Sequence, residues 1–253
     1  MQTYLVALFE AQARRRSAST SPINDRPLVA SERDEIGWLD LVASPVFANP
    51  TKTKERATEK DNRLRQLKAA LRTLEKCGLI ALKGKEFRNG RFEGFQLQHE
   101  SGAPGFTGSP QYKIPFPSGD MIRLPVAFFL QGWIHTLSPA EVATYLMFHH
   151  LARRYPREHQ EAGVYISGFN REEKYGLSRD VYESHRALST FGLIELMPDL
   201  TRRADGRVKQ FNERVRRGEM LLPHRFKVFG DAQLNRNSLT VVRNSLKRLI
   251  ARS

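Results

Sequence analysis

The sequence predicts an α+β fold made of two similar halves, each with helices followed by a β-hairpin. The main observation is a repeated segment, since residues 70–82 read ALRTLEKCGLIAL and residues 184–196 read SHRALSTFGLIEL. In both copies the end of an amphipathic helix is followed by glycine and then by Leu-Ile-x-Leu, which is typical of a strand. Glycine adopts the left-handed backbone of a helix C-terminus at no cost, because it has no Cβ. Each copy therefore predicts a helix, a stop and a strand.

The first half contains three predicted helices and a hairpin. We expect helices over residues 4–16 and 31–42, and a third that begins between residues 58 and 62 and ends at Cys77. Leucines at 64, 67, 71 and 74 recur at the spacing of one buried helix stripe. Residues 79–82 and 95–98 are the expected strands, and Asn89-Gly90 between them is a strong hairpin-turn signal.

The second half begins its first long helix at Ser138, because Ser-Pro-x-Glu supplies an N-cap, a proline in the first turn and a capping box. A short helix over residues 171–175, capped by Asn170, is expected to end at Gly176. Ser178 then caps a helix that reaches Phe191. About three residues separate these helices, which is the spacing of a helix-turn-helix motif. Residues 193–197 and 226–229 are the expected strands.

Composition shifts divide the chain into a first domain (1–100), a linker (101–119), a second domain (120–230) and a basic C-terminal helix (231–253). The linker is rich in glycine and proline, which favours an extended connection. The C-terminal helix carries Leu239, Val242, Leu246 and Leu249 on one side, and this face favours a protein contact such as a homodimer.

The chain of 253 residues has a net charge of +14, and the excess is concentrated in two blocks. Residues 51–100 carry 13 basic and 7 acidic side chains, and residues 201–253 carry 14 and 4. The other parts of the chain are close to neutral. Charge focused in this way favours a polyanionic partner over a general effect on solubility.

Several classes of function lack their sequence signals. Cys77 is the single cysteine, so no intramolecular disulfide forms and a cysteine-based zinc site is not expected. No stretch resembles a signal peptide or a membrane span. We therefore expect a cytoplasmic, nucleoid-associated protein. No P-loop, dinucleotide-binding motif or nucleophile elbow is found, so we expect no catalytic residue, no metal and no cofactor. His149 and His150 are adjacent and would point about 100° apart on a helix.

The chain resembles the winged helix-turn-helix superfamily from Ser138 to Phe229, and also from Tyr4 to Gln98. The resemblance implies two winged helix-turn-helix domains, each with a three-helix core and a β-wing, plus a C-terminal helix. Tandem copies in a basic chain of this length resemble plasmid replication initiators of the iteron-binding kind. A tandem winged-helix transcriptional regulator fits the same features equally well. Double-stranded DNA is the partner that either family implies.

The candidate DNA-binding residues of the first domain lie on its third helix and its wing. The helix offers the side chains outside its leucine stripe, namely Arg63, Arg65, Gln66 and Arg72. Arginine binds guanine and glutamine binds adenine through paired hydrogen bonds in the major groove. The wing offers cations for phosphate contacts, namely Lys83, Lys85, Arg88 and Arg91.

The second domain offers both kinds of contact. Its third helix is expected to bury Val181, Leu188 and Phe191 and to present Arg179, Tyr182, Glu183 and Arg186 to base edges. Its wing carries a long basic segment for phosphate contacts, comprising Arg202, Arg203, Arg207, Lys209, Arg214, Arg216 and Arg217. Neutralising several phosphates would make binding strongly dependent on salt.

Two alternatives remain open at the level of sequence. The exposed charges could be an ordinary solvated helix surface and a basic loop. The chain could also be a non-catalytic tandem winged-helix subunit of a chromosome-organising complex, which would use exposed apolar patches to bind protein. The concentration of charge in two blocks favours the sequence-specific DNA-binding protein, acting in transcription regulation or in plasmid replication or partition.

Overall fold

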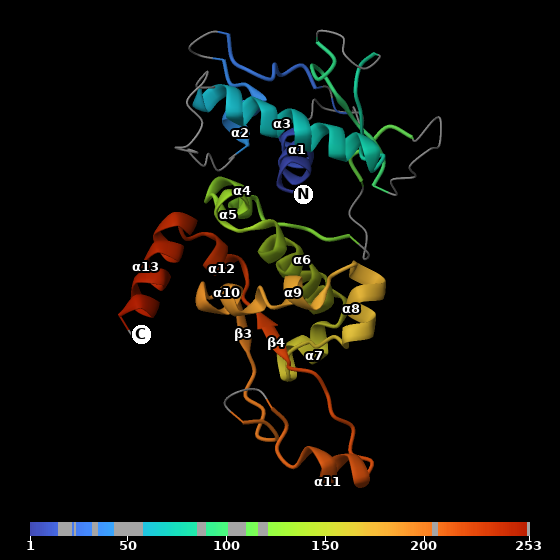
Figure 1. Cartoon of the computed structure of the whole chain (residues 1–253), viewed down its shortest axis with the longest axis vertical. Helices are drawn as coiled ribbons and strands as arrows, with labels where there is room; N and C mark the ends of the chain where they lie inside the picture. The colour runs from blue at the N-terminus through green and yellow to red at the C-terminus, as the bar shows by residue number, and fades with distance from the viewer. Residues whose placement is uncertain are drawn as a thin grey trace, which may run out of the picture. The chain divides into compact units, whose positions relative to one another are not determined.

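The computed structural model describes residues 1–14, 22, 24–31, 35–42, 58–84, 90–100, 110–115, 121–203 and 207–251. The chain divides into unit 1, residues 1–117, and unit 2, residues 118–253. Among the described residues, helices combine with two antiparallel sheets of two strands each, so the class is mixed helix and sheet (Figure 1).

Unit 1 packs helix α1 (Gln2–Ala13) and the short α2 (Trp38–Leu41) against α3 (Glu59–Lys76). Helix α3 begins at Thr58, whose hydroxyl accepts from the Asp61 amide while the Asp61 carboxylate accepts from the Thr58 amide. The leucine stripe is buried at residues 67, 71 and 74, as its spacing predicts, and Leu64 is half-buried.

The spacing of Leu5, Leu8 and Phe9 predicts that they share the buried face of helix α1, but the helix buries a different face. Val6, Ala7 and Ala11 are buried, whereas Leu5, Leu8 and Phe9 are only partly covered. Ala7 and Ala11 have small side chains, which bring the backbones of neighbouring elements close together. The apolar pattern of this segment is nearly uniform around the helix, so periodicity could not select its buried face.

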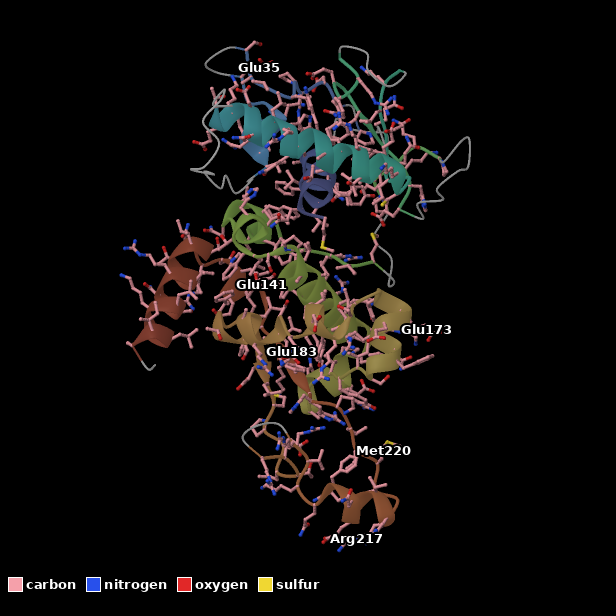
Figure 2. The ribbon with its side chains drawn as sticks, in the orientation of Figure 1. Glu35, Glu141, Glu173, Glu183, Arg217 and Met220 are labelled. Atoms are coloured by element: carbon pink, nitrogen blue, oxygen red, sulfur yellow. The ribbon has the colours of Figure 1, made fainter. Side chains whose placement is uncertain are left out.

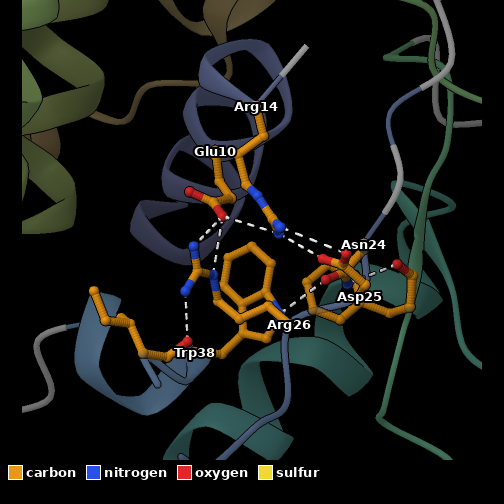
Figure 3. A network of polar contacts seen from close by, with 8 residues as sticks. Glu10, Arg14, Asn24, Asp25, Arg26 and Trp38 are labelled. Carbon is orange, nitrogen blue, oxygen red and sulfur yellow. Dashed lines mark hydrogen bonds and ion pairs between the residues drawn. The ribbon is translucent and has the colours of Figure 1, made fainter. Parts of the chain in front are cut away.

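Polar side chains attach the segment 24–31 of unit 1 to α1 (Figure 3). The Arg26 guanidinium donates to the Glu10 carboxylate, with its Nε at 2.9 Å from Oε1, and Arg14 donates to Asp25 at 2.5 Å. Asn24 accepts from the Trp38 indole at 3.1 Å and donates to the Phe95 carbonyl at 2.9 Å. These contacts connect the first two helices to the hairpin.

The hairpin of unit 1 pairs β1 (Ile80–Ala81) with β2 (Gln96–Leu97), and Ile80 faces Leu97. Asn89, the first residue of the expected turn, lies outside the described residues. Residues 110–115, within the expected linker, belong to unit 1, because Gln111 bridges to Gln98 and the Tyr112 amide donates to the Leu97 carbonyl at 3.0 Å. The Tyr112 ring is buried, which explains why this proline-flanked stretch is held in place.

Unit 2 is built around α6 (Pro139–Arg154), which follows α4 (Val126–Leu130) and α5 (Trp133–Thr136). The predicted start of α6 is confirmed: Ser138 is the N-cap, Pro139 lies in the first turn and Glu141 completes the capping box. Helix α6 is buried on most sides, with Val142, Tyr145 and Phe148 fully covered. It therefore forms the core of this unit.

Helices α7 (Pro156–Glu161) and α8 (Gly168–Tyr175) follow. Between them Val164 exchanges two backbone hydrogen bonds with Phe226, both at 2.8 Å, and these two residues form a single antiparallel bridge. The N-cap of α8 is Ser167, and the expectation of Asn170 was wrong. Ser167 lies three residues upstream and its hydroxyl accepts from the Asn170 amide. The helix ends at Gly176 with φ +63°, as predicted.

The helix expected from Ser178 to Phe191 is interrupted. Ser178 caps α9 (Arg179–Tyr182), a turn at residues 183 and 184 follows, and α10 (His185–Thr190) completes the segment. The Val181 carbonyl accepts from the Ser184 amide and from the hydroxyl of buried Thr144 on α6. The side-chain bond from α6 holds the segment at its break.

The second hairpin pairs β3 (Ile194–Leu196) with β4 (Phe226–Val228), and Ile194 faces Val228. Between them runs a long connection, residues 197–225, which we call the arm and which contains α11 (Phe211–Arg216). Figure 1 shows the arm extending away from the helices of unit 2. Helices α12 (Asp231–Leu234) and α13 (Ser238–Ile250) end the chain, and α13 packs on α5.

The repeated sequence gives the same hydrogen bonds in both units. Gly78 and Gly192 have φ of +69° and +72°. The amide of each following leucine donates to the carbonyl of the leucine five residues earlier, at 3.0 Å for Leu79 and 2.9 Å for Leu193. This pattern is a Schellman motif. The carbonyls of Leu79 and Leu193 then accept from the amides of Gln98 and Phe229, so the two hairpins leave their helices in equivalent registers.

Candidate nucleic-acid interface

The turn between α8 and α9 is fixed from inside by Arg171. This side chain is buried, its Nε donates to the Leu177 carbonyl at 2.9 Å, and its guanidinium lies 4.9 Å from the centre of the Tyr182 ring. A buried charge is tolerated where hydrogen bonds and an aromatic face replace water. Arg171 of α8 therefore contacts both the turn, at Leu177, and α9, at Tyr182. Sequence reasoning missed this role because nothing in a basic sequence separates a buried arginine from an exposed one.

The exposed side of α9 and α10 presents arginines. Arg179 is exposed at the first position of α9. The Arg186 side chain is 78% exposed, and its Nε lies 2.9 Å from the Glu183 carboxylate. An exposed ion pair of this kind contributes little to stability, so a ligand can replace it at small cost. These three residues lie where the sequence predicts them.

Tyr182 does not lie on this exposed side. Its ring contacts Phe148, Phe226 and His185, with centroid distances of 5.9, 6.3 and 5.0 Å. Burial raises the pKa of Tyr182 to about 12. The break after α9 turns the ring towards β4, so the expectation of an outward-facing tyrosine, which assumed one continuous helix, was wrong.

The seven arm cations that the sequence predicts to contact DNA fall into two groups. Arg202 and Arg214 stabilise the arm itself. Arg202 is 15% exposed and bonds to Asp199 and to the Leu222 carbonyl, and Arg214 bonds to Glu219 at 2.6 Å. The other cations are exposed on the surface of the arm, namely Arg203, Arg207, Lys209, Arg216 and Arg217. Figure 2 labels Arg217 near α11. The cations that remain exposed can contact phosphate.

In unit 1 the predicted residues are more often used internally. The Arg63 guanidinium donates to the Leu39 carbonyl at 2.6 Å and so connects α3 to α2. Arg91 is 11% exposed and pairs with Glu75 at 2.6 Å. Arg72 is exposed but lies 5.0 Å from the Phe92 ring. Arg65, Gln66 and Lys83 are exposed, and Lys85 and Arg88 lie outside the described residues.

Four histidines of unit 2 have lowered pKa values. Desolvation by burial is the largest cause at His135, His149, His159 and His224. At His149 the neighbouring Arg153 lowers the pKa further, and Asp231 opposes the shift. These imidazoles are neutral at neutral pH and add no charge to the basic surface.

Among the described residues, no group of three or more His, Cys, Asp or Glu side chains is placed to hold a metal ion. No helix in the described ranges is both long and apolar enough to cross a bilayer. No protein-family model, curated protein or solved structure matches the chain.

Proposed function

We propose that the chain is a sequence-specific double-stranded DNA-binding protein with two winged helix-turn-helix domains. The observation that supports this most strongly is in unit 2. Helix α8, a three-residue turn and α9 are followed by a hairpin whose arm exposes five cations, and Arg179 and Arg186 are exposed on α9 and α10. In a winged helix-turn-helix protein, this arrangement places the third helix in the major groove and the wing along the phosphate backbone.

The two kinds of contact have separate tasks. Arg179 and Arg186 are donors suited to guanine edges, and each such paired contact contributes about 1–3 kcal/mol of discrimination. The arm cations hold phosphate without regard to sequence. Unit 1 supplies a smaller set, with Arg65, Gln66, Arg72 and Lys83 exposed. We propose transcription regulation or plasmid replication or partition as the role, with the choice depending on where the binding site lies.

The test is selection of binding sites from a random-sequence duplex library at two salt concentrations. Recovery of a defined motif at both concentrations is the expected result. Binding that enriches no motif and disappears at the higher salt concentration would leave only the electrostatic attraction to phosphate and would refute sequence specificity.

A second copy of the chain is a further proposed partner, because α13 leaves Leu239, Leu246, Leu249 and Ile250 exposed. Its buried side is instead formed by Ser238 and Val241, next to α5. The same exposed face is the observation that favours the alternative of a protein-interaction subunit. Mass measurement in solution over a range of concentrations tests the dimer, and Leu246→Glu should abolish it. A monomer at every concentration would remove this proposal.

A further inference from the structure

Unit 2 contains a cavity of about 610 Å³ beside α8, and its walls come from three neighbouring elements. His150 and Arg154 lie on α6, Tyr165 lies on the segment between α7 and α8, and Lys174 and Tyr175 lie near the end of α8. The volume is within the range of sites for small molecules, about 300–1,000 Å³. It is also larger than the cavity of unit 1, about 220 Å³, and the cavity of the arm, about 420 Å³.

The walls of this cavity combine aromatic rings with unneutralised cations. Three tyrosines line it, at positions 155, 165 and 175. Among the described residues, no carboxylate forms an ion pair with Arg154 or Lys174, although Glu158 also lines the cavity. The arm cavity differs here, because its lining arginines 202 and 214 already pair with Asp199 and Glu219.

Two further polar features line the cavity. Ser167, the N-cap of α8, lies at the end of this helix opposite to Lys174. His150 and the Tyr175 hydroxyl are joined by a hydrogen bond of 2.8 Å, which fixes the ring. Burial raises the pKa of Tyr175, and the nearby Arg154 opposes this shift.

We propose that this cavity binds a small aromatic anion, whose ring lies among the tyrosines and whose carboxylate or phosphate group pairs with Arg154 and Lys174. Charge-assisted hydrogen bonds from these cations are stronger than neutral ones. The tyrosine faces supply the apolar contact and the edge-to-face geometry that aromatic rings prefer.

The position of the cavity links it to DNA binding, a step that rests on the proposed function. Lys174 and Tyr175 lie directly before the Gly176 turn that leads into α9. The wall residue Val164 is bonded to Phe226, at the base of the arm. A ligand that binds one arrangement of these elements more tightly changes DNA affinity, and DNA then changes ligand affinity by the same factor.

The test is calorimetric titration of the full chain, without DNA, with benzoate, phenyl phosphate, phenol and inorganic phosphate. Saturable binding of benzoate or phenyl phosphate, with phenol and inorganic phosphate much weaker, is expected, and the two aromatic anions distinguish a carboxylate from a phosphate. Arg154→Gln and Lys174→Gln should each weaken binding about tenfold. Arg157→Gln is the matched control, because Arg157 is exposed on α7 outside the cavity lining.

The proposal is overturned if neither aromatic anion binds, if phenol binds as tightly as benzoate, or if both cavity variants bind like the wild type. The bound probe is then added to the DNA titration, where a changed affinity in the wild type but not in Lys174→Gln is expected. An unchanged DNA affinity would refute the coupling. A failure of the proposed DNA-binding function gives a different result from a failure of the ligand proposal. In that case the chain does not bind duplex DNA even when no probe is present.

Discussion

Units 1 and 2 close their third helix with the same glycine and the same hydrogen bonds, yet they use the following hairpin differently. In unit 1 the chain returns from β1 to β2 within residues 82–95, and Arg91 of this hairpin is bonded back to Glu75. In unit 2 the return takes residues 197–225, and five cations of the arm stay exposed. The two units therefore share the helix C-terminus and the start of the hairpin, and they differ in the surface that we propose to bind DNA.

The third helices differ in the same sense. Helix α3 runs unbroken over Glu59–Lys76, and its Arg63 side chain is hydrogen-bonded to α2. The corresponding segment of unit 2 is broken between α9 and α10, and around this break Tyr182 is half-buried while Arg179 and Arg186 are exposed. Unit 2 is therefore the better candidate for reading DNA, and we propose that unit 1 contributes a smaller number of contacts.

The largest expected effect is at the arm. Replacing Arg203, Arg207, Lys209, Arg216 and Arg217 with glutamine should weaken duplex binding by about two to three orders of magnitude and make the salt slope shallower by about 4 to 5. Fluorescence anisotropy over a range of salt concentrations measures both. A charge-matched control replaces exposed cations outside the arm, namely Arg153, Arg157, Arg236, Arg243 and Lys247. Equal losses in the two variants would show that only net charge matters.

The second largest effect is expected for arginines in the third helix of each unit, and it should differ between the units. Arg179→Gln and Arg186→Gln should each reduce affinity for the selected site by about 5- to 150-fold and leave binding to random DNA nearly unchanged. Arg65→Gln in unit 1 should cost about threefold or less, since an exposed phosphate contact carries no base discrimination. Competition titrations give both affinities. A larger loss for Arg65→Gln than for Arg179→Gln and Arg186→Gln would contradict the assignment of base contacts to unit 2.

The shared glycine is expected to matter for stability. Gly192→Ala forces a side chain into the left-handed region and should lower the free energy of unfolding by about 1–2 kcal/mol. A Cβ at Gly192 would meet nothing within 4 Å, so this cost is conformational and not steric. Gly78→Ala should cost unit 1 a similar amount. Urea denaturation of the two variants measures it, and an unchanged midpoint for both would contradict the Schellman assignment.

The smallest effect concerns pH. The four histidines with lowered pKa values belong to unit 2, so the folded state binds fewer protons there than the unfolded state does. Their contribution to stability is present above the unfolded pKa of about 6.5 and is lost as pH falls through the lower folded values. Urea midpoints between pH 7.5 and 5 should therefore fall, and less steeply in His149→Gln. A midpoint that rises on acidification would contradict the assigned direction.

Much of the scaffold could be predicted from the sequence because its signals are local. The capping box at Ser138, the glycine stops at Gly78, Gly176 and Gly192 and the strands after them depend on a few neighbouring residues. Prediction failed where two possible N-cap residues lie close together. Ser167 caps α8 three residues before Asn170, which was the expected cap.

The sequence could not predict which candidate DNA-binding side chains stay exposed and which form internal contacts, because this depends on residues far apart in the chain. Arg63 bonds to a carbonyl 24 positions away and Arg202 to one 20 positions away, while Arg186 pairs with Glu183, three positions away on the same segment. Tyr182 is half-buried because α9 stops there and Phe226, which follows the arm in the sequence, packs against its ring. The cavity beside α8 is likewise formed by three separate elements.

The central claim is that unit 2 reads DNA through α9, α10 and the arm. Hydrogen exchange of the full chain, with and without a selected duplex, tests it most directly, because it reports every described segment in one experiment. We predict that DNA slows exchange most in residues 179–190 and 197–225, with a smaller change in α3. Slower exchange confined to unit 1, or no change in the arm, would contradict the claim.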